Sequence, residues 1–289
     1  MSRRTNDRST GRGRNTVSVL CFTLCAVLLF LKCGSSTTGP PSPDHAKRFL
    51  KLSGYEFDEK SFITAANNGD AAAVTAFLQA GINANAIDAS GETALMAAAT
   101  QGKKEVVQVL LQAGVDINKK TPGGYTALLK ALGGKKEDVA ELLVAQPKLE
   151  VNARGEDGIT ALMLYVWRSR EDIVESLLQR GADVNLQEHD GDTALHAAAS
   201  TGNSNIIRLL LAKGASANIK NKLGGTPLMW AAVYGYTDAV RLLLEHGADA
   251  RLQDVEGVTA SQWADKNKRT EIAQLLREAE KGQAVSSKQ

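Results

Sequence analysis

A short block of sequence returns along this chain at a nearly constant interval. Its pattern is Gly-x-Thr followed by Ala or Pro, and Leu comes next in five of the six copies. The copies stand 33, 34, 33, 33 and 33 residues apart, and their threonines are Thr93, Thr126, Thr160, Thr193, Thr226 and Thr259. A fixed period of this length predicts a stack of similar units, because one such unit cannot bury its own apolar face.

Each interval contains two short apolar runs with the spacing of an α-helix. In the clearest copy the second run extends from residue 206 to residue 211, and Gly202 separates it from the first run. Another glycine follows the second run, where a left-handed residue ends a helix at little cost. The segment after it holds Asn, Asp and Gly, as a turn or hairpin requires. We expect Leu209 and Leu210 to be buried between neighbouring units.

The copy from Gly191 to Asn218 resembles the ankyrin repeat, and the resemblance extends from about Phe57 to about Ala279. It implies an all-α solenoid of about seven helix-turn-helix units joined by short hairpin-like loops. The first and last units depart from the pattern, as capping units should. The domain is expected to span 49–280, with units at 57–90, 91–123, 124–157, 158–190, 191–223, 224–256 and 257–280.

Two interior units depart from the common pattern. The third has Leu132 in place of a motif alanine, and Gln146-Pro147 where other copies have Gly-Ala. The fourth replaces the small residues of its first helix with a Leu-Tyr-Val-Trp run at 164–167, and Ser169 replaces a glycine. Larger side chains change how neighbouring helices pack, so we expect the least regular geometry between residues 131 and 170.

Residues 1–33 are predicted to be a signal peptide or a signal anchor. Five arginines and one aspartate give residues 1–16 a net charge of +4, and residues 17–31 form an apolar run. A basic start followed by such a run is typical of a secretory signal. The run is shorter than the roughly 20 residues of a membrane-spanning helix. Cleavage and retention stay open, and either places the repeat domain outside the cytoplasm, secreted, periplasmic or tethered to a membrane.

The cysteines all lie within residues 21–33, so the repeat domain cannot house a Cys-based site. Cys33-Gly-Ser-Ser resembles the start of a mature lipoprotein, but Lys32 stands where such signals have a small residue. Lipidation at Cys33 and ordinary cleavage therefore both stay open. Residues 34–48, rich in Pro, Ser, Thr and Gly, are expected to form a tether, and 281–289 a polar tail.

Charge and motifs argue against nucleic-acid binding and against catalysis. The chain has a formal net charge of +2, so the sequence after residue 16 carries −2, without the basic face that nucleic acid requires. No Gly-x-Ser-x-Gly, His-Glu-x-x-His or phosphate-loop motif occurs. His196 is interpreted as part of the repeat framework, and the Glu-His-Asp run at 188–190 as a solvated turn. We predict no catalytic residue, no metal site, no cofactor and a monomer.

By the resemblance, the hairpin tips and the exposed side of the first helices are expected to bind a partner protein. Aromatic and arginine side chains are frequent interface anchors. Two interpretations of Trp167 stay open, an anchor for the partner or a filler of altered packing, whereas Trp230 and Trp263 are expected to pack. The candidate partner-binding residues are Glu92, Tyr125, Ile159, Trp167, Arg168, Asp192, Val233 and Tyr234.

The sequence therefore predicts a non-catalytic protein–protein interaction module or scaffold that acts outside the cytoplasm on an unidentified protein. Membrane association would run through residues 17–31 or through Cys33. Three alternatives stay open. They are an accessory or inhibitory subunit of an exported enzyme, an enzyme with a cryptic site near His189, and a surface spacer without a dedicated partner.

Overall fold

The computed structural model describes residues 42–286, and every regular element within that range is an α-helix. Helix α2 (Pro43–Leu52) precedes seven helix pairs. The first helices of the pairs, here called inner helices, are α3 (Glu59–Asn68), α5 (Ala94–Gln101), α7 (Ala127–Gly133), α9 (Ala161–Trp167), α11 (Ala194–Thr201), α13 (Pro227–Tyr234) and α15 (Ala260–Lys266). The second, outer helices are α4 (Ala71–Gln79), α6 (Lys104–Gln112), α8 (Glu137–Val144), α10 (Glu171–Gln179), α12 (Ser204–Ala212), α14 (Thr237–Glu245) and α16 (Thr270–Ser286).

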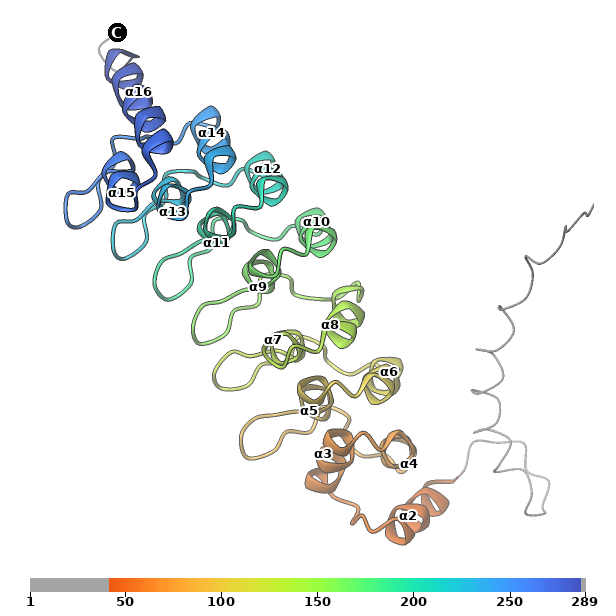
Figure 1. Ribbon diagram of the computed structural model, residues 1–289. Helices are drawn as coiled ribbons and strands as arrows, with labels where there is room; N and C mark the ends of the chain where they lie inside the picture. Colours follow the sequence, from red (N-terminus) through yellow and green to blue (C-terminus); the bar gives the residue numbers. More distant parts are fainter. Residues whose placement is uncertain (1–41, 287–289) are drawn as a thin grey trace, which may run out of the picture. The chain divides into compact units, whose positions relative to one another are not determined.

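The pairs stack in chain order, and this confirms the predicted all-α solenoid of seven units. Inner helices form one row, outer helices form a second, and the hairpin loops project from the inner row (Figure 1). Each inner helix packs against the inner helices of the units before and after it, and most outer helices do the same within their own row. The buried apolar side chains consequently form one continuous cluster from Ala46 to Leu276.

The Gly-x-Thr block sets where each inner helix starts. In all six copies the threonine hydroxyl accepts a hydrogen bond from the backbone N–H three residues later, and this satisfies one free donor of the helix start. The preceding glycine closes the hairpin. Gly191 has φ +87°, and a Cβ there would lie 2.9 Å from the Cα of Asn221 in the next hairpin. The recurring block therefore combines a helix cap with a glycine that, at Gly124, Gly158, Gly191 and Gly224, lies close to the backbone of the next hairpin.

The first described helix begins within the segment that was expected to be a tether. Residues 43–48, expected in the tether, form the first turns of α2. Ala46 and Leu50 are buried, and α2 packs against α4, so this helix covers the apolar face of the first pair.

The predicted leader (1–33) and the start of the tether lie outside the described residues. Among the helices of residues 42–286, none combines the length and the apolar character needed to span a membrane.

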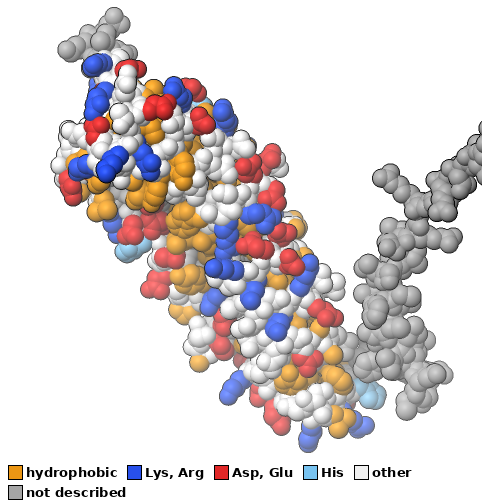
Figure 2. Space-filling view, viewed as in Figure 1, with side chains coloured by type: hydrophobic (Ala, Val, Ile, Leu, Met, Phe, Trp, Pro, Cys, Tyr) orange, Lys and Arg blue, Asp and Glu red, His pale blue; other side chains and the backbone are white. Residues whose placement is uncertain are grey.

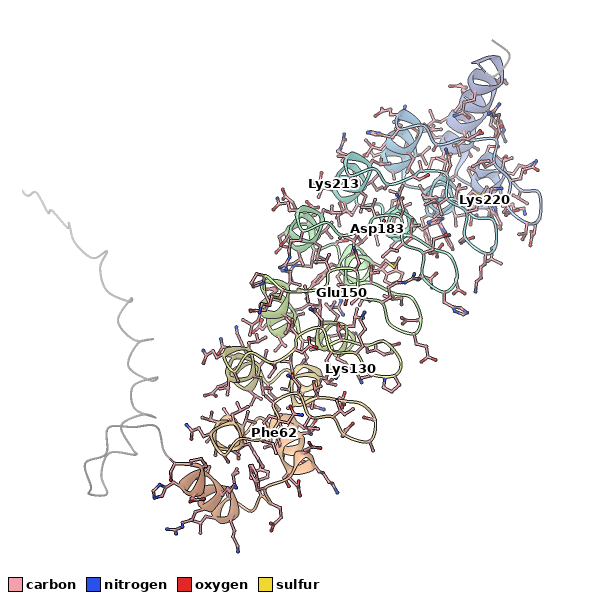
Figure 3. The ribbon with its side chains drawn as sticks, turned by 180° about the vertical axis from the view of Figure 1, so that it is seen from behind. Phe62, Lys130, Glu150, Asp183, Lys213 and Lys220 are labelled. Atoms are coloured by element: carbon pink, nitrogen blue, oxygen red, sulfur yellow. The ribbon has the colours of Figure 1, made fainter. Side chains whose placement is uncertain are left out.

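A ladder of asparagines joins successive loops, and the sequence interpretation missed it. The side chain of Asn118 accepts from the N–H of Glu150 (2.7 Å), and that of Asn152 accepts from Asp183 (2.8 Å), in successive loops of the stack (Figure 3). Each side-chain amide also donates to a carbonyl in the following loop, to that of Lys148 from Asn118 and to that of Gly181 from Asn152. At the far end Gln283 bonds the loop after α14 in the same two ways. Helix α16 continues to residue 286 and so extends into the segment 281–289 that was expected to be a polar tail.

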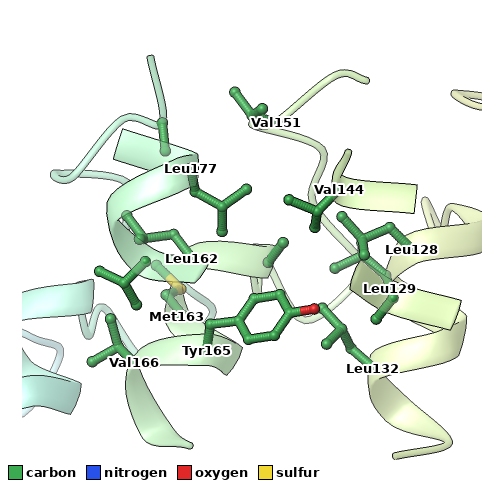
Figure 4. Close-up of a cluster of buried hydrophobic side chains, with 14 of the residues drawn as sticks. Leu128, Leu129, Leu132, Val144, Val151, Leu162, Met163, Tyr165, Val166 and Leu177 are labelled. Carbon is green, nitrogen blue, oxygen red and sulfur yellow. The ribbon is translucent and has the colours of Figure 1, made fainter. Parts of the chain in front are cut away.

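Packing between the third and fourth units departs from the repeat. Tyr165 is fully buried and points from α9 toward Leu132 of α7 (Figure 4). These two helices contact each other less extensively than other adjacent inner helices do. Where the third unit lacks the usual Gly-Ala, Arg180 of the next unit donates to the carbonyls of Val144 and Gln146 at the end of α8. A side chain of one unit thus compensates for an irregularity in its neighbour.

We predict that Leu210→Ala lowers the free energy of unfolding by about 2–5 kcal/mol, because this side chain is fully buried in α12. The sequence expectation for Leu209 is wrong, since it is only half-buried at the edge of the cluster. Leu209→Ala should therefore cost less. Urea unfolding followed by circular dichroism measures both, with the exposed Arg208→Ala as the control. A loss below about 0.5 kcal/mol for Leu210→Ala, the usual value for a surface site, would contradict the packing of α12.

A second stability prediction concerns Ser169. This residue has φ +54°, at the place where Gly102, Gly202 and Gly235 link the helices of other units. A side chain in the left-handed region costs about 1–2 kcal/mol, so Ser169→Gly should raise the free energy of unfolding by about 1 kcal/mol. Ser169→Ala keeps the Cβ and should bring no such gain. The reverse change, Gly202→Ser, should destabilise strongly, because its Cβ would lie 2.4 Å from the Tyr236 ring. Thermal melts of the three variants measure the differences. A melting temperature of Ser169→Gly below that of the unaltered chain would contradict backbone strain at Ser169.

Candidate functional site

A small pocket opens on the inner-helix side of the stack, over α11. The middle helix contributes small residues, whereas α9 and α13 on either side contribute aromatic rings. The volume is about 110 Å³, below the roughly 300–1,000 Å³ of small-molecule sites, so the pocket suits a single side chain. It is lined by Trp167, Asp192, His196, Ala197, Ser200, Trp230 and Tyr234.

Exposed aromatic rings line this pocket on two sides, and one more ring stacks on them. Trp167 is 41% exposed, Tyr234 47% and Tyr236 37%. Trp230 stacks on Tyr234 at 6.0 Å between ring centroids, and Tyr234 stacks on Tyr236 at 6.3 Å. We call these four residues the aromatic patch. Figure 2 shows hydrophobic side chains gathered over the inner helices in the C-terminal half of the stack.

The structure brings three of the predicted site residues, Trp167, Asp192 and Tyr234, to one pocket. It also adds Trp230, which the sequence interpretation assigned to packing. Trp230 does pack against the core, but it lines the pocket as well. The sequence did contain a signal for this role of Trp230. It lies four residues before Tyr234, and residues at that spacing share one face of a helix.

Asp192 supplies the carboxylate of the pocket. Its Oδ1 accepts from the side chain of Asn221 (2.9 Å) and lies 4.0 Å from Nε2 of His196. Burial lowers the pKa of His196, which favours the neutral ring. Its Nδ1 accepts from the N–H of Thr193 (3.1 Å) and Nε2 lies 3.2 Å from the Gly225 carbonyl, which fits a proton on Nε2. His196 thus ties the helix start to the next hairpin and leaves the Asp192 carboxylate without a buried counter-charge.

Three other predicted site residues make contacts elsewhere in the fold. The Tyr125 hydroxyl donates to the carboxylate of Asp157 (3.3 Å). Glu92 forms an ion pair with Lys130 (3.0 Å). Ile159 is half-buried against the core. None of the three lines the pocket.

Arg168 and Val233, also predicted to bind a partner, lie beside the pocket without lining it. Arg168 turns back onto the preceding unit, where its guanidinium donates to the carboxylate of Glu137 and to the carbonyl of Leu132. This side chain therefore joins two units. Val233 is half-buried on α13 between two members of the aromatic patch.

The turn at 188–190, interpreted above as a solvated turn, is held by backbone hydrogen bonds. Glu188 accepts from the backbone N–H groups of Asp190 (2.8 Å) and Asp192 (3.0 Å). The N–H of His189 donates to the carbonyl of Asp157 (2.7 Å). In the part of the chain that the structure describes, no three His, Cys, Asp or Glu residues come together as metal ligands.

A family model of ankyrin repeats, taken three copies at a time, covers the chain without a gap from residue 41 to its end. The matched segments are 41–121, 62–155, 119–188, 139–221, 162–254 and 213–289. No curated protein matches the chain. Ankyrin repeats are protein–protein interaction modules and are generally not catalytic. The repeat spacing, the stacked helix pairs and this match agree, and the chain belongs to the ankyrin-repeat family.

Proposed function

We propose that this protein binds another protein through the aromatic patch, outside the cytoplasm and without catalysing a reaction. The observation that carries the proposal is the gathering of Trp167, Trp230 and Tyr234, from the units on either side of α11, around one pocket, with Tyr236 stacked on Tyr234. Large aromatic side chains dominate interface energetics, and an exposed apolar patch often marks a binding site. Ankyrin repeats are protein–protein interaction modules, which agrees with a protein as the partner.

The rigidity of the stack supports this assignment. Trp167 ends α9 and Tyr234 ends α13, and both helices are fixed by buried contacts with their neighbours. Rings held in place before binding lose little freedom when a partner arrives, so more of the contact energy appears as affinity. The proposed interface centres on the pocket over α11, which Tyr125, Ile159 and Glu92 do not line.

The location outside the cytoplasm is supported by residues 1–31, which combine a net charge of +4 over residues 1–16 with an apolar run. A fusion of residues 1–48 to a reporter that is active only outside the cytoplasm is expected to give signal. Deletion of residues 17–31 should abolish that signal. Mass spectrometry of the mature N-terminus separates cleavage, lipidation at Cys33 and an uncleaved anchor. An intact Met1 on soluble cytosolic protein would rule out export.

We predict that Trp167→Ala and Tyr234→Ala each weaken binding of the partner by about 2 kcal/mol or more, as interface anchors do. Both side chains are almost half exposed, so the melting temperature should change little. A partner recovered by cross-linking in native extract, followed by calorimetric titration with purified protein, provides the measurement.

Tyr125→Ala is the matched control, because it removes the same kind of side chain away from the pocket. Its effect on binding should stay within about 0.5 kcal/mol, as for an ordinary surface site. If folded Trp167→Ala and Tyr234→Ala bind the partner as well as the unaltered chain does, the aromatic patch is not the interface.

A further inference from the structure

Resting on the interface proposed above, we propose that the pocket over α11 receives a lysine side chain of the partner. The ammonium group would lie between the aromatic rings and the carboxylate of Asp192. The partner would therefore present a lysine at the centre of the contact. Four observations on the pocket lead to this chemistry.

The rings of the pocket are the first observation. Trp167 comes from α9, and Trp230 and Tyr234 come from α13, so aromatic rings flank the pocket on two sides. A cation within about 6 Å of the centroid of such a ring is attracted by its electron-rich face. Tryptophan is the strongest of these rings, and the pocket has two.

The chain itself shows the pairing one unit further on. Trp263 occupies in the last unit the place that Trp230 has in the unit before, 33 residues earlier. The Nζ of Lys266 lies 4.5 Å from the centroid of the Trp263 ring. The residue corresponding to Lys266 in the earlier unit is Val233, which has no cation to offer. The indole of Trp230 therefore lacks the lysine that its counterpart has.

The hydrogen-bond acceptors of the pocket are the third observation. Oδ1 of Asp192 is occupied by Asn221, whereas no donor within residues 42–286 reaches Oδ2. The hydroxyl of Ser200 donates to the carbonyl of Ala197 (2.8 Å), which leaves its lone pairs available. The neutral His196 beside them brings no positive charge. An incoming ammonium would find one charged and one neutral acceptor.

The size of the pocket and the single unoccupied oxygen of Asp192 favour a lysine over other side chains as the occupant. A guanidinium binds a carboxylate best through two parallel hydrogen bonds, which need both oxygens, and Asn221 already occupies one. An ammonium is a compact point charge that needs only one. An apolar side chain would bury the Asp192 carboxylate without a positive charge to offset it, which is unfavourable. A volume of about 110 Å³ leaves room for one side chain only.

The test uses the purified full chain with ¹⁵N-labelled tryptophan and the probe Nα-acetyl-lysine methylamide. The indole N–H signals of Trp167 and Trp230 should shift saturably at millimolar probe. The signal of Trp263 should stay in place, because Lys266 already covers that ring. The neutral analogue Nα-acetyl-norleucine methylamide has the same carbon chain without the charge and should bind at least tenfold more weakly. Equal binding of the two probes, or no shift with the lysine probe, overturns the proposal.

Two matched variants test the role of the carboxylate. Asp192→Asn removes the charge and keeps the acceptor for Asn221, and should weaken the lysine probe at least tenfold. Glu92→Gln removes the same charge at the equivalent Gly-x-Thr position of an earlier unit, and should change binding less than twofold. Unchanged affinity in Asp192→Asn would overturn the proposal. The norleucine comparison on the unaltered chain does not depend on how well this variant folds.

The captured partner separates this inference from the proposed function. If its binding falls with both Trp167→Ala and Asp192→Asn, the lysine pocket is supported. If it falls with Trp167→Ala but not with Asp192→Asn, the interface stands and the lysine pocket is overturned. If it falls with neither variant, both proposals fail.

Discussion

The stack depends on one constraint, which is that no unit can cover its own apolar face. Each helix pair therefore relies on the pair before and the pair after it, and the two ends need special coverage. At the N-terminal end α2 supplies it with Ala46 and Leu50. At the other end the long α16 closes the last unit, and Gln283 continues the loop contacts that asparagines make elsewhere. Both ends are thus explained by the need to bury what a further unit would have buried.

The same constraint explains why irregular units still fit. A change in one unit is tolerated when a neighbour adjusts to it, and the contacts of Arg180 and Arg168 across units show this directly. The candidate site also depends on sequence differences that the stack tolerates. Small residues of α11 lie between aromatic residues of α9 and α13, so the pocket comes from differences between units that share one backbone plan. Function on such a fold is carried by side chains that vary while the framework stays constant.

The sequence predicts the fold well because the decisive signals are local. The threonine cap, the glycine between the helices and the apolar spacing each act within a few residues, and the cap alone recurs six times. Helix α2 was missed because nearby prolines indicated extended chain, although Pro43 lies in the first turn, where its missing N–H costs nothing. The pocket was predicted only in part. Its residues come from three units, and which of Trp167, Trp230 and Arg168 faces solvent depends on packing that no local pattern records.

The last two units show why the region of α11 and α13 is the place to expect a partner. They share a tryptophan at equivalent positions, Trp230 and Trp263. The terminal unit covers its tryptophan with Lys266 and ties the indole N–H to Asp254 (2.7 Å). Within residues 42–286 the indole N–H of Trp230 has no such partner, and its ring borders an open pocket that contains a carboxylate. One unit covers its aromatic ring from within the chain, and we infer that the unit before it leaves the pocket-facing side of the equivalent ring to a partner.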